Sequence, residues 1–571
     1  MKSYQGVGIS AGIAIGPVFR YETETIVVQE GTCCGPDVEY ARLEEALEKS
    51  TQELEDILEK ARKDLDTGSN EAEIFDAHLM LLSDPDLLEQ VKSNIYDKSF
   101  TAEYAWYQAT EYYADLIGGM DSEYLAARSA DIKDVAQRVL RHLVGDNNDS
   151  CRMISIPSVV VAKDLTPSDT VSFDKSKVLG FCTISGGPTS HVAILSKALG
   201  IPAVVGIGPW MDELTPGRMV IVDGFSGKMF LDPDKDTIAK YNQTASLYEE
   251  SFKKAIESTK EFAITKDGRR VEVVANIGGL EDAKTAVEFG AEGVGLLRTE
   301  FIFLERDTAP TEEEQIQVYK DIFAQFGSNP VVTRTLDIGG DKPANYLKIP
   351  EEMNPFLGLR GTRLALARPE VFHTQLRALM RAGIGYNLKV MFPMVGTVQE
   401  VRDVMAHVKQ VKQNLTDEGV PFEQKIEWGI MIEIPSAAVM ADALAREVDF
   451  FSIGTNDLSQ YTLAADRGNT NVVGVADSLD PAVLRLIKMV VDAAHANKKW
   501  VGLCGELAGD GMATPVLLGL GIDEFSMNPR AIPLVKQAIR KFSMNTAKEI
   551  ADNALGLATT ADVRYYLKSF I

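Results

Sequence analysis

The chain has 571 residues, of which 45% are hydrophobic and 25% charged, as in ordinary globular proteins, and its length suits about three or four domains. A formal net charge of −25 argues against general nucleic-acid binding, and no apolar run approaches the roughly 20 residues of a membrane span. Five scattered cysteines without a CxxC pair argue against a disulfide framework or a zinc site. The first ten residues lack the apolar core of a signal peptide, so we expect a cytoplasmic protein without membrane insertion.

The N-terminal part of the chain combines a strand-like segment with a long helical region. Residues 6–18 are rich in glycine and β-branched residues and predict a pair of short strands. Between Leu43 and Leu65, leucine, isoleucine and alanine recur at helical spacing, and similar patterns continue, so residues 36–145 predict an all-α bundle. Acidic residues outnumber basic ones in residues 1–150. This excess indicates either an ordinary solvated helical coat or a steering surface for a basic partner.

A change of pattern near residue 152 predicts a compact α/β domain. Short β-type runs occur at residues 158–162, 177–183, 203–207, 219–224 and 228–232. We expect the N-terminal strand segment to pair with these runs, which makes the helical bundle an insertion. The predicted domains are residues 1–20 plus 150–235 (α/β), 21–149 (helical), 236–262 (helical linker) and 263–571 (the C-terminal domain).

Eight further strand-like runs alternate with helical segments from residue 271 onward. They cover residues 271–277, 293–299, 331–337, 388–394, 428–434, 450–456, 500–506 and 524–528. Near-continuous apolar runs are typical of parallel strands covered on both faces. Eight such units in about 300 residues favour a (β/α)8 barrel over an open doubly wound sheet. The predicted fold is therefore a multidomain α/β protein with a C-terminal (β/α)8 barrel.

Polar side chains gather where the predicted barrel strands end. They are Arg298, Arg334, Asp337, Glu433, Asn456, Asp457, Cys504 and Glu506. Because the carboxyl ends of barrel strands meet on one face, where the active site lies, these residues predict a single site. Charges with a purely structural role would be scattered over both ends of the barrel.

Arginines and carboxylates near this face suggest the chemistry of the substrate. Carboxylate and phosphate groups match the planar donor fork of arginine, and candidates for such contacts are Arg298, Arg334, Arg360 and Arg467. Glu433 and Asp457 follow apolar runs, where an unpaired carboxylate is costly. We predict that they bind Mg²⁺ together with substrate oxygens; a buried arginine–carboxylate pair is the alternative.

Two further side chains are candidates for a chemical step. His191 lies in GGPTSHVAILS, residues 186–196, just before a predicted helix, where the helix dipole favours an anion such as a phosphoryl group. An isolated histidine at a helix start more often has a structural role. Cys504, between two glycines at a predicted strand end, is either a small buried side chain or a proton donor to carbon.

These motifs resemble the Enzyme I family of the bacterial sugar phosphotransferase system. Residues 186–208 are similar to the phosphohistidine loop that Enzyme I shares with pyruvate phosphate dikinase and phosphoenolpyruvate synthase, although Pro188 and Lys197 depart from its usual pattern. The barrel phrases RTEFIFLERDTAPTEEEQ, FFSIGTNDLSQYTLAADRGN and CGELAGD are similar to its phosphoenolpyruvate-binding domain. The resemblance runs in colinear order from Gly6 to about Arg540.

The resemblance implies a reaction and a role for each candidate residue. His191 takes the phosphoryl group of phosphoenolpyruvate, releasing pyruvate, and passes it to a histidine of the phosphocarrier HPr. The implied roles are Mg²⁺ binding by Glu433 and Asp457, substrate binding by Arg298, Arg334, Arg360, Asn456 and Arg467, support of the histidine by Thr170, and protonation of the enolate by Cys504. The family also implies a homodimer through the barrel and a domain swivel, which we expect near residues 21–35, 146–155 and 236–262. HPr docking is expected on the helical domain, around Leu79, Leu82, Ser83, Asp84 and Asp86.

Three alternative functions remain open at this point. A nucleotide-linked relative needs a further ATP-binding domain, for which residues 1–145 are too few and too helical, and no Walker motif is present. A non-catalytic sensor of phosphoenolpyruvate has no need of the retained His191, Glu433, Asp457 and Cys504. An aldolase-type lyase on a bare barrel leaves the residues before the barrel unexplained.

Overall fold

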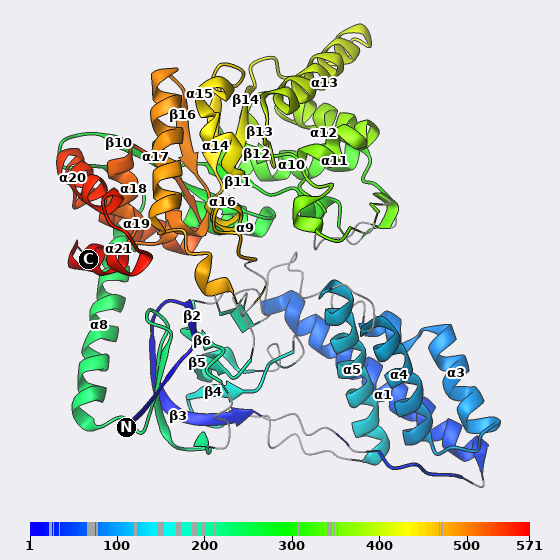
Figure 1. Ribbon diagram of the computed structural model, residues 1–571. Coiled ribbons are helices and arrows are strands. Elements are labelled where there is room, and N and C mark those ends of the chain that lie inside the picture. Colours follow the sequence, from blue (N-terminus) through cyan, green and yellow to red (C-terminus); the bar gives the residue numbers. More distant parts are fainter. Residues whose placement is uncertain are drawn as a thin grey trace. The chain divides into compact units, whose positions relative to one another are not determined.

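The computed structural model divides the chain into two compact units, Met1–Glu249 and Glu250–Ile571 (Figure 1). The structure describes all residues except 22–25, 27, 34, 65–74, 76–77, 119–122, 146–153, 167–168, 170–172, 186–191, 194, 197–199, 209–212, 305, 307, 340–344, 348, 351, 467–468, 470–471 and 571. Thr170, His191 and Arg467 therefore lie outside the described residues. Within the described part of the chain, no helix is long and apolar enough to cross a membrane.

The helical part of the first unit is built as its apolar periodicity predicts. Its long helices are α1 (Pro36–Asp64), α3 (Pro85–Tyr96), α4 (Ala102–Gly118) and α5 (Glu123–Val144). Asp84 caps the N-terminus of helix α3, where its carboxylate accepts the N–H groups of Asp86 and Leu87. Leu82 is only 4% exposed because it packs into the core of this bundle. The expectation that Leu82 contacts a docking partner is therefore wrong.

The rest of the first unit contains an eight-stranded sheet among its described residues. The strand order is β1 (Lys2–Gln5), β8 (Lys228–Leu231), β7 (Met219–Asp223), β3 (Ile13–Tyr21), β4 (Ser158–Ala162), β5 (Val178–Thr183), β6 (Ala203–Val205) and β2 (Val7–Ser10). The N-terminal strands thus share one sheet with the strands after residue 158, as the sequence predicts. The two strands predicted within residues 6–18 are present as β2 and β3; β3 lies between the buried strands β7 and β4, whereas β2 lies at an edge beside β6.

Helix α8 (Lys235–Glu257) agrees with the predicted helical linker and spans the boundary between the two units. The segment that follows it is held by helix α19 (Ile532–Arg540) of the second unit. The buried ammonium of Lys536 donates to the carbonyls of Thr259, at 2.9 Å, and Gly290, at 2.8 Å. Arg540 donates to the carbonyl of Ser258 at 3.0 Å. The residues just after α8 are therefore fixed to the second unit.

The second unit is a closed barrel of parallel strands. In order around the ring these are β10 (Arg270–Ile277), β11 (Val294–Leu297), β12 (Pro330–Arg334), β13 (Asn387–Phe392), β14 (Glu427–Ile432), β15 (Phe450–Ile453), β16 (Trp500–Leu503) and β17 (Glu524–Met527). Strand β10 pairs with both β11 and β17, which closes the ring. The predicted (β/α)8 barrel is confirmed, and the open doubly wound sheet is excluded. A short strand, β9 (Ala263–Ile264), pairs antiparallel with β10.

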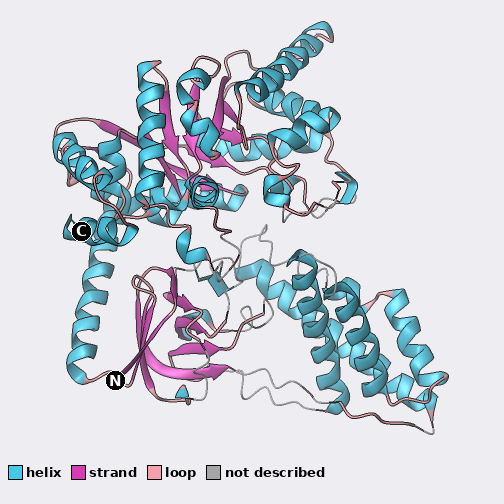
Figure 2. Cartoon of the chain, viewed as in Figure 1, coloured by secondary structure: helices cyan, strands magenta, loops and turns pink. Residues whose placement is uncertain are grey.

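Helices cover the outside of the barrel (Figure 2). They are α9 (Leu280–Glu288), α10 (Glu312–Phe326), α11 (Thr362–Ala367), α12 (Pro369–Ala382), α13 (Val398–Asp417), α14 (Pro435–Val439), α15 (Ala441–Leu444), α16 (Thr455–Leu463), α17 (Pro481–Ala496), α18 (Thr514–Leu520), α19, α20 (Met544–Leu555) and α21 (Thr560–Leu567). Capping boxes start α10 and α13, where Thr311 pairs with Glu314 and Thr397 with Glu400. One large apolar core joins these helices to the outer faces of the strands.

The carboxyl group of Glu524, the first residue of β17, should make the stability of the barrel depend on pH. Its side chain is 2% exposed, and burial, together with Glu272, raises its pKa to about 8 against the opposing charge of Lys389. Between about pH 4.5 and pH 8 the unfolded chain loses this proton while the folded chain keeps it, so stability falls as pH rises. We expect Glu524→Gln, which stays neutral, to stabilise the barrel at pH 8 by up to a few kcal/mol, or about 1.4 kcal/mol per unit of pKa shift. Calorimetric unfolding at pH 5 and pH 8 tests this, and an equal stability change at both pH values would contradict it.

Candidate active site

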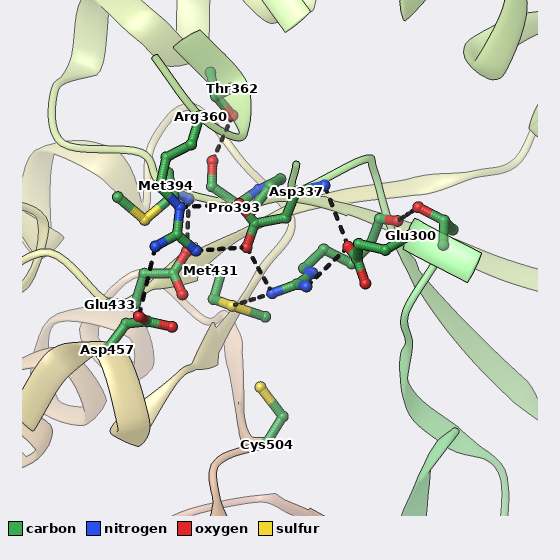
Figure 3. A network of polar contacts seen from close by, with 12 residues as sticks. Glu300, Asp337, Arg360, Thr362, Pro393, Met394, Met431, Glu433, Asp457 and Cys504 are labelled. Carbon is green, nitrogen blue, oxygen red and sulfur yellow. Dashed lines mark hydrogen bonds and ion pairs between the residues drawn. The ribbon is translucent and has the colours of Figure 1, made fainter. Parts of the chain in front are cut away.

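The carboxyl ends of the barrel strands bring polar residues from distant parts of the sequence together (Figure 3). Arg334 is the last residue of β12, and Glu433 directly follows β14. Asp457 lies in the first turn of α16, which follows β15, and Cys504 directly follows β16. Each of these side chains is buried. Because the strands are parallel and neighbouring, their ends form one polar mouth.

A chain of alternating charges crosses this mouth. Glu300 Oε1 accepts a hydrogen bond from Arg334 Nη2 at 2.9 Å, and Arg334 Nη1 lies 3.1 Å from Asp337 Oδ2. Arg360 binds the same carboxylate through both Nε, at 3.3 Å, and Nη2, at 3.0 Å. Arg360 Nη1 lies 3.8 Å from Asp457 Oδ1. Asp337 thus holds two guanidinium groups side by side.

The two guanidinium groups stay charged despite their burial. Burial alone disfavours the charged form, but nearby carboxylates outweigh this effect and raise the pKa of both groups. For Arg334 the main carboxylates are Glu300 and Asp337, and for Arg360 they are Asp337 and Asp457. Two fixed, permanently charged donor forks at one barrel mouth can orient an anion that carries carboxylate or phosphate groups.

Glu433 offers a buried oxygen that suits a cation. Its Oε1 accepts the backbone N–H of Met394 at 2.6 Å, whereas its buried Oε2 has no hydrogen-bond partner within the described structure. Burial, and then the charges of Asp457 and Asp337, raise the pKa of Glu433 to about 8, although Arg334 and Arg360 oppose this shift. A divalent cation beside Oε2 would offset the repulsion between these carboxylates.

The backbone approaches the buried oxygen of Glu433 closely. A Cβ atom at Gly454 would lie 3.1 Å from Glu433 Oε2, so a side chain at this position would crowd the carboxylate. Met394, which donates to the other oxygen, has a φ of 55°, an unfavourable angle for a residue with a side chain. Among the described residues no group of three or more histidine, cysteine, aspartate or glutamate side chains is arranged for a metal. An ion held by Glu433 and Asp457 would therefore also need oxygens from substrate and water, which Mg²⁺ commonly uses as ligands.

Cys504 is a buried thiol whose surroundings disfavour the thiolate. Its side chain packs with Met431 and Phe450 inside the barrel, and burial raises the pKa of the thiol to about 11. The group therefore keeps its proton at neutral pH. Figure 3 shows its sulfur pointing toward the polar mouth, and the amide of Asn276 fixes its carbonyl at 2.8 Å.

Of the remaining predicted site residues, the structure describes Arg298 and Asn456. Arg298 is exposed just beyond β11, and no hydrogen bond or ion pair of its guanidinium occurs within the described residues. Asn456 is half-buried, and its Oδ1 accepts the N–H of Glu506 at 3.1 Å. Thr170, His191 and Arg467 lie outside the described residues, so their predicted roles stay predictions. The sequence did not single out Glu300, which is two residues beyond Arg298 and contacts Arg334.

Comparisons with known proteins match nearly the whole chain. Residues 253–544 match the family described as "PEP-utilising enzyme, PEP-binding domain", residues 5–128 match "PEP-utilising enzyme, N-terminal", and residues 154–227 match "PEP-utilising enzyme, mobile domain". The phosphoenolpyruvate-protein phosphotransferase of Priestia megaterium is 47% identical over 568 residues, covering 100% of this chain and 99% of the relative. Proteins of the same name from Geobacillus stearothermophilus and Bacillus subtilis are 46% and 45% identical, and the matches cover 99% and 100% of this chain and 98% and 99% of the respective relatives.

Substitution of Gly454, beside Glu433, tests the predicted cation site. We expect Gly454→Ala to weaken binding of a divalent cation about tenfold, because the added methyl group crowds both Glu433 Oε2 and Met431 Sδ at 3.1 Å. Mn²⁺ binding, followed by electron paramagnetic resonance, measures the change. Gly511→Ala is the matched control, since a Cβ there meets nothing within 4 Å. Equal Mn²⁺ affinity in the two variants would place the ion elsewhere.

Proposed function

The chain belongs to the phosphoenolpyruvate-protein phosphotransferase family, since relatives of that name are 45–47% identical to it over 99–100% of its length, and from this premise we propose that His191 carries the phosphoryl group. The chain is an enzyme that transfers the phosphoryl group of phosphoenolpyruvate to protein in the sugar phosphotransferase system. In the proposed step the P–O bond of phosphoenolpyruvate breaks and a P–N bond forms to an unprotonated ring nitrogen of His191. The leaving group is the enolate of pyruvate.

Substrate binding falls to the arginines at the barrel mouth. The observation that carries this assignment is the pair of buried, charged guanidinium groups of Arg334 and Arg360, which share Asp337. Arg298 adds an exposed donor fork beyond the neighbouring strand β11. We assign Asn456 and Arg467 to the same substrate on the family resemblance. Together these groups neutralise and orient a trianion, which is the main requirement of phosphoryl transfer.

The residues present fit a magnesium ion. Glu433 and Asp457 would hold it, since Glu433 Oε2 is buried without a hydrogen-bond partner in the described structure and lies beside Gly454, which has no side chain to crowd it. Bound there, Mg²⁺ would supply positive charge to the substrate oxygens. The carboxylates contribute the position of that charge, because Met394 and the end of β14 fix Glu433.

Cys504 would complete the reaction by delivering a proton. Its thiol is protonated at neutral pH and faces the barrel mouth. Transfer of this proton to C3 of the enolate gives pyruvate and leaves a thiolate, which regains a proton from solvent before the next turnover. Ketonisation of the enolate favours phosphorylation of the histidine.

The acceptor, by the family resemblance, is HPr. Its proposed docking region on the helical domain includes the half-buried Leu79, the exposed Ser83 and the carboxylates of Asp84 and Asp86, an acidic surface suited to a basic partner. The predicted division into four domains and the swivel that carries His191 between barrel and carrier belong to this proposal, as does a cytoplasmic location.

We also propose a homodimer through the barrel. Large apolar side chains are exposed in the segments that follow barrel strands, where an isolated subunit would leave them in water. Met353 is 98% exposed after β12, and Val439 and Val475, after β14 and β15, are each 57% exposed. Such residues at one end of a barrel suit burial by a second copy.

Labelling with phosphoenolpyruvate tests the phosphoryl acceptor. With labelled phosphoenolpyruvate, Mg²⁺ and no nucleotide, we expect an acid-labile, base-stable label on the wild type and none on His191→Ala. His495→Ala, which alters a histidine paired with Asp523 at 2.8 Å outside the site, should keep the label. Label that survives loss of His191 would reject the assignment, and label from ATP alone would favour a nucleotide-linked relative.

Substitution of Cys504 separates binding from protonation. We expect Cys504→Ala to lower kcat by about 10²- to 10⁴-fold, the usual contribution of general acid catalysis, with little change in the Kd for phosphoenolpyruvate. The pKa of the thiol is about 11. A pH range of 6 to 9 lies about two or more units below this value, so the wild type should not lose turnover there through deprotonation of Cys504. Steady-state kinetics and equilibrium binding measure the two effects. Near-normal kcat with a lower Tm would instead indicate a structural cysteine.

A further inference from the structure

Glu300 is a buried carboxylate to which neither the sequence motifs nor the proposed mechanism gives a role. It opens the short 3-10 turn Glu300–Ile302 beyond strand β11, two residues after Arg298. Its side chain is part of the alternating charge chain, next to Asp337 and away from Glu433 and Asp457 (Figure 3). Only 3% of the residue is exposed, so its charge is removed from water at considerable cost.

A single oxygen of Glu300 holds two groups. Its Oε1 accepts from Arg334 Nη2 at 2.9 Å and from the backbone N–H of Asp337 at 3.2 Å. The first contact fixes the plane of a guanidinium, and the second fixes the backbone that carries the Asp337 carboxylate. That carboxylate in turn receives both Arg334 and Arg360. Both arginines are therefore aligned, directly or through Asp337, by the position of one atom.

Neighbouring polar groups keep this part of the barrel rigid. Thr299, fully buried, donates from its hydroxyl to the carbonyl of Arg334 at 3.0 Å. The Gln375 side chain donates to the same hydroxyl at 3.1 Å and accepts the N–H of Leu336 at 3.0 Å. Glu300 thus acts from a fixed support, which a positioning group requires.

We propose that Glu300 is a positioning residue for phosphoenolpyruvate binding, and that its Oε1 orients the donor forks of Arg334 and Arg360 toward the substrate. This inference rests on the proposed function, in which the two arginines bind the substrate. A guanidinium binds carboxylate or phosphate well only when its planar fork faces the anion. A guanidinium group turned away from the substrate would still supply positive charge, but it would lose its paired hydrogen bonds to the anion.

Charge alone predicts the opposite role for this residue. The charge chain already holds the carboxylates of Asp337 and Asp457 beside its two guanidinium groups, and a further negative charge repels an anionic substrate. If Glu300 acted only through its charge, removing that charge would tighten substrate binding. If it acts through position, removing the acceptor oxygen weakens binding even though a negative charge is lost.

Two substitutions of nearly equal shape separate these roles. Glu300→Met removes the acceptor oxygen, and Glu300→Gln keeps an oxygen but removes the charge. For Glu300→Met we expect the KM for phosphoenolpyruvate to rise about 10- to 100-fold, as for a lost hydrogen bond to a charged group, with a smaller change in kcat. For Glu300→Gln we expect a KM within about threefold of the wild type, because the amide oxygen can accept both N–H groups. Glu524→Met, at a comparably buried glutamate that begins rather than follows a barrel strand, is the matched control and should leave KM unchanged.

The outcomes are decisive in both directions. An unchanged or lower KM in Glu300→Met, or an equal rise in both variants, overturns the inference. If Glu300→Met does not fold, Glu300→Asp replaces it, since the shorter side chain keeps the charge and withdraws the oxygen; a raised KM supports the inference and an unchanged KM overturns it. Failure of the proposed function is recognised separately, because the wild type itself would then take no label from phosphoenolpyruvate.

Discussion

Asp337 lies between two buried guanidinium groups, and the polar mouth of the barrel depends on this shared carboxylate. Burial of a charge costs several kcal/mol unless partners compensate for it, so the buried charges of Arg334 and Arg360 require carboxylate partners. The contacts at 3.0–3.3 Å to Arg360 and 3.1 Å to Arg334 provide that compensation on both sides. The same contacts fix the direction of both donor forks before any substrate arrives. Substrate binding then requires little rearrangement of charged groups.

The barrel scaffold makes this arrangement possible, because its parallel strands end side by side. The end of β12 provides Arg334 and, three residues later, Asp337, while the end of β14 provides Glu433. Glu433 is stabilised through a strained neighbour, since Met394 has a positive φ and donates its N–H to Glu433 Oε1. Strain of this kind persists only where surrounding contacts determine the backbone, as they do at the ends of packed barrel strands.

Much of the barrel could be predicted from the sequence, because buried parallel strands require near-continuous apolar runs and all eight runs became strands. The residues after those runs also predicted the face that carries Arg334, Glu433, Asp457 and Cys504. Contacts between distant segments were not predictable in this way. Glu300 contacts Arg334 across 34 residues, and nothing in its local sequence distinguishes it from a surface glutamate. Leu82 was misjudged for a related reason, since periodicity does not specify which neighbour an apolar face meets.

The excess of negative charge at the mouth explains why cation and substrate should bind together. Burial, and then the charges of Asp457 and Asp337, raise the pKa of Glu433 to about 8, so ionising this carboxylate beside Asp457 is costly. A trianionic substrate placed beside two ionised carboxylates would add to this repulsion, whereas a divalent cation between them would remove it. A bound cation therefore lowers the cost of binding the anion, and the anion, by supplying further oxygen ligands, lowers the cost of holding the cation. The arginines cannot replace the cation in this respect, because Asp337 already compensates much of their charge. In the proposed mechanism these two arginines mainly provide direction, and most of the net positive charge would come from the ion, from the exposed Arg298 and from Arg467.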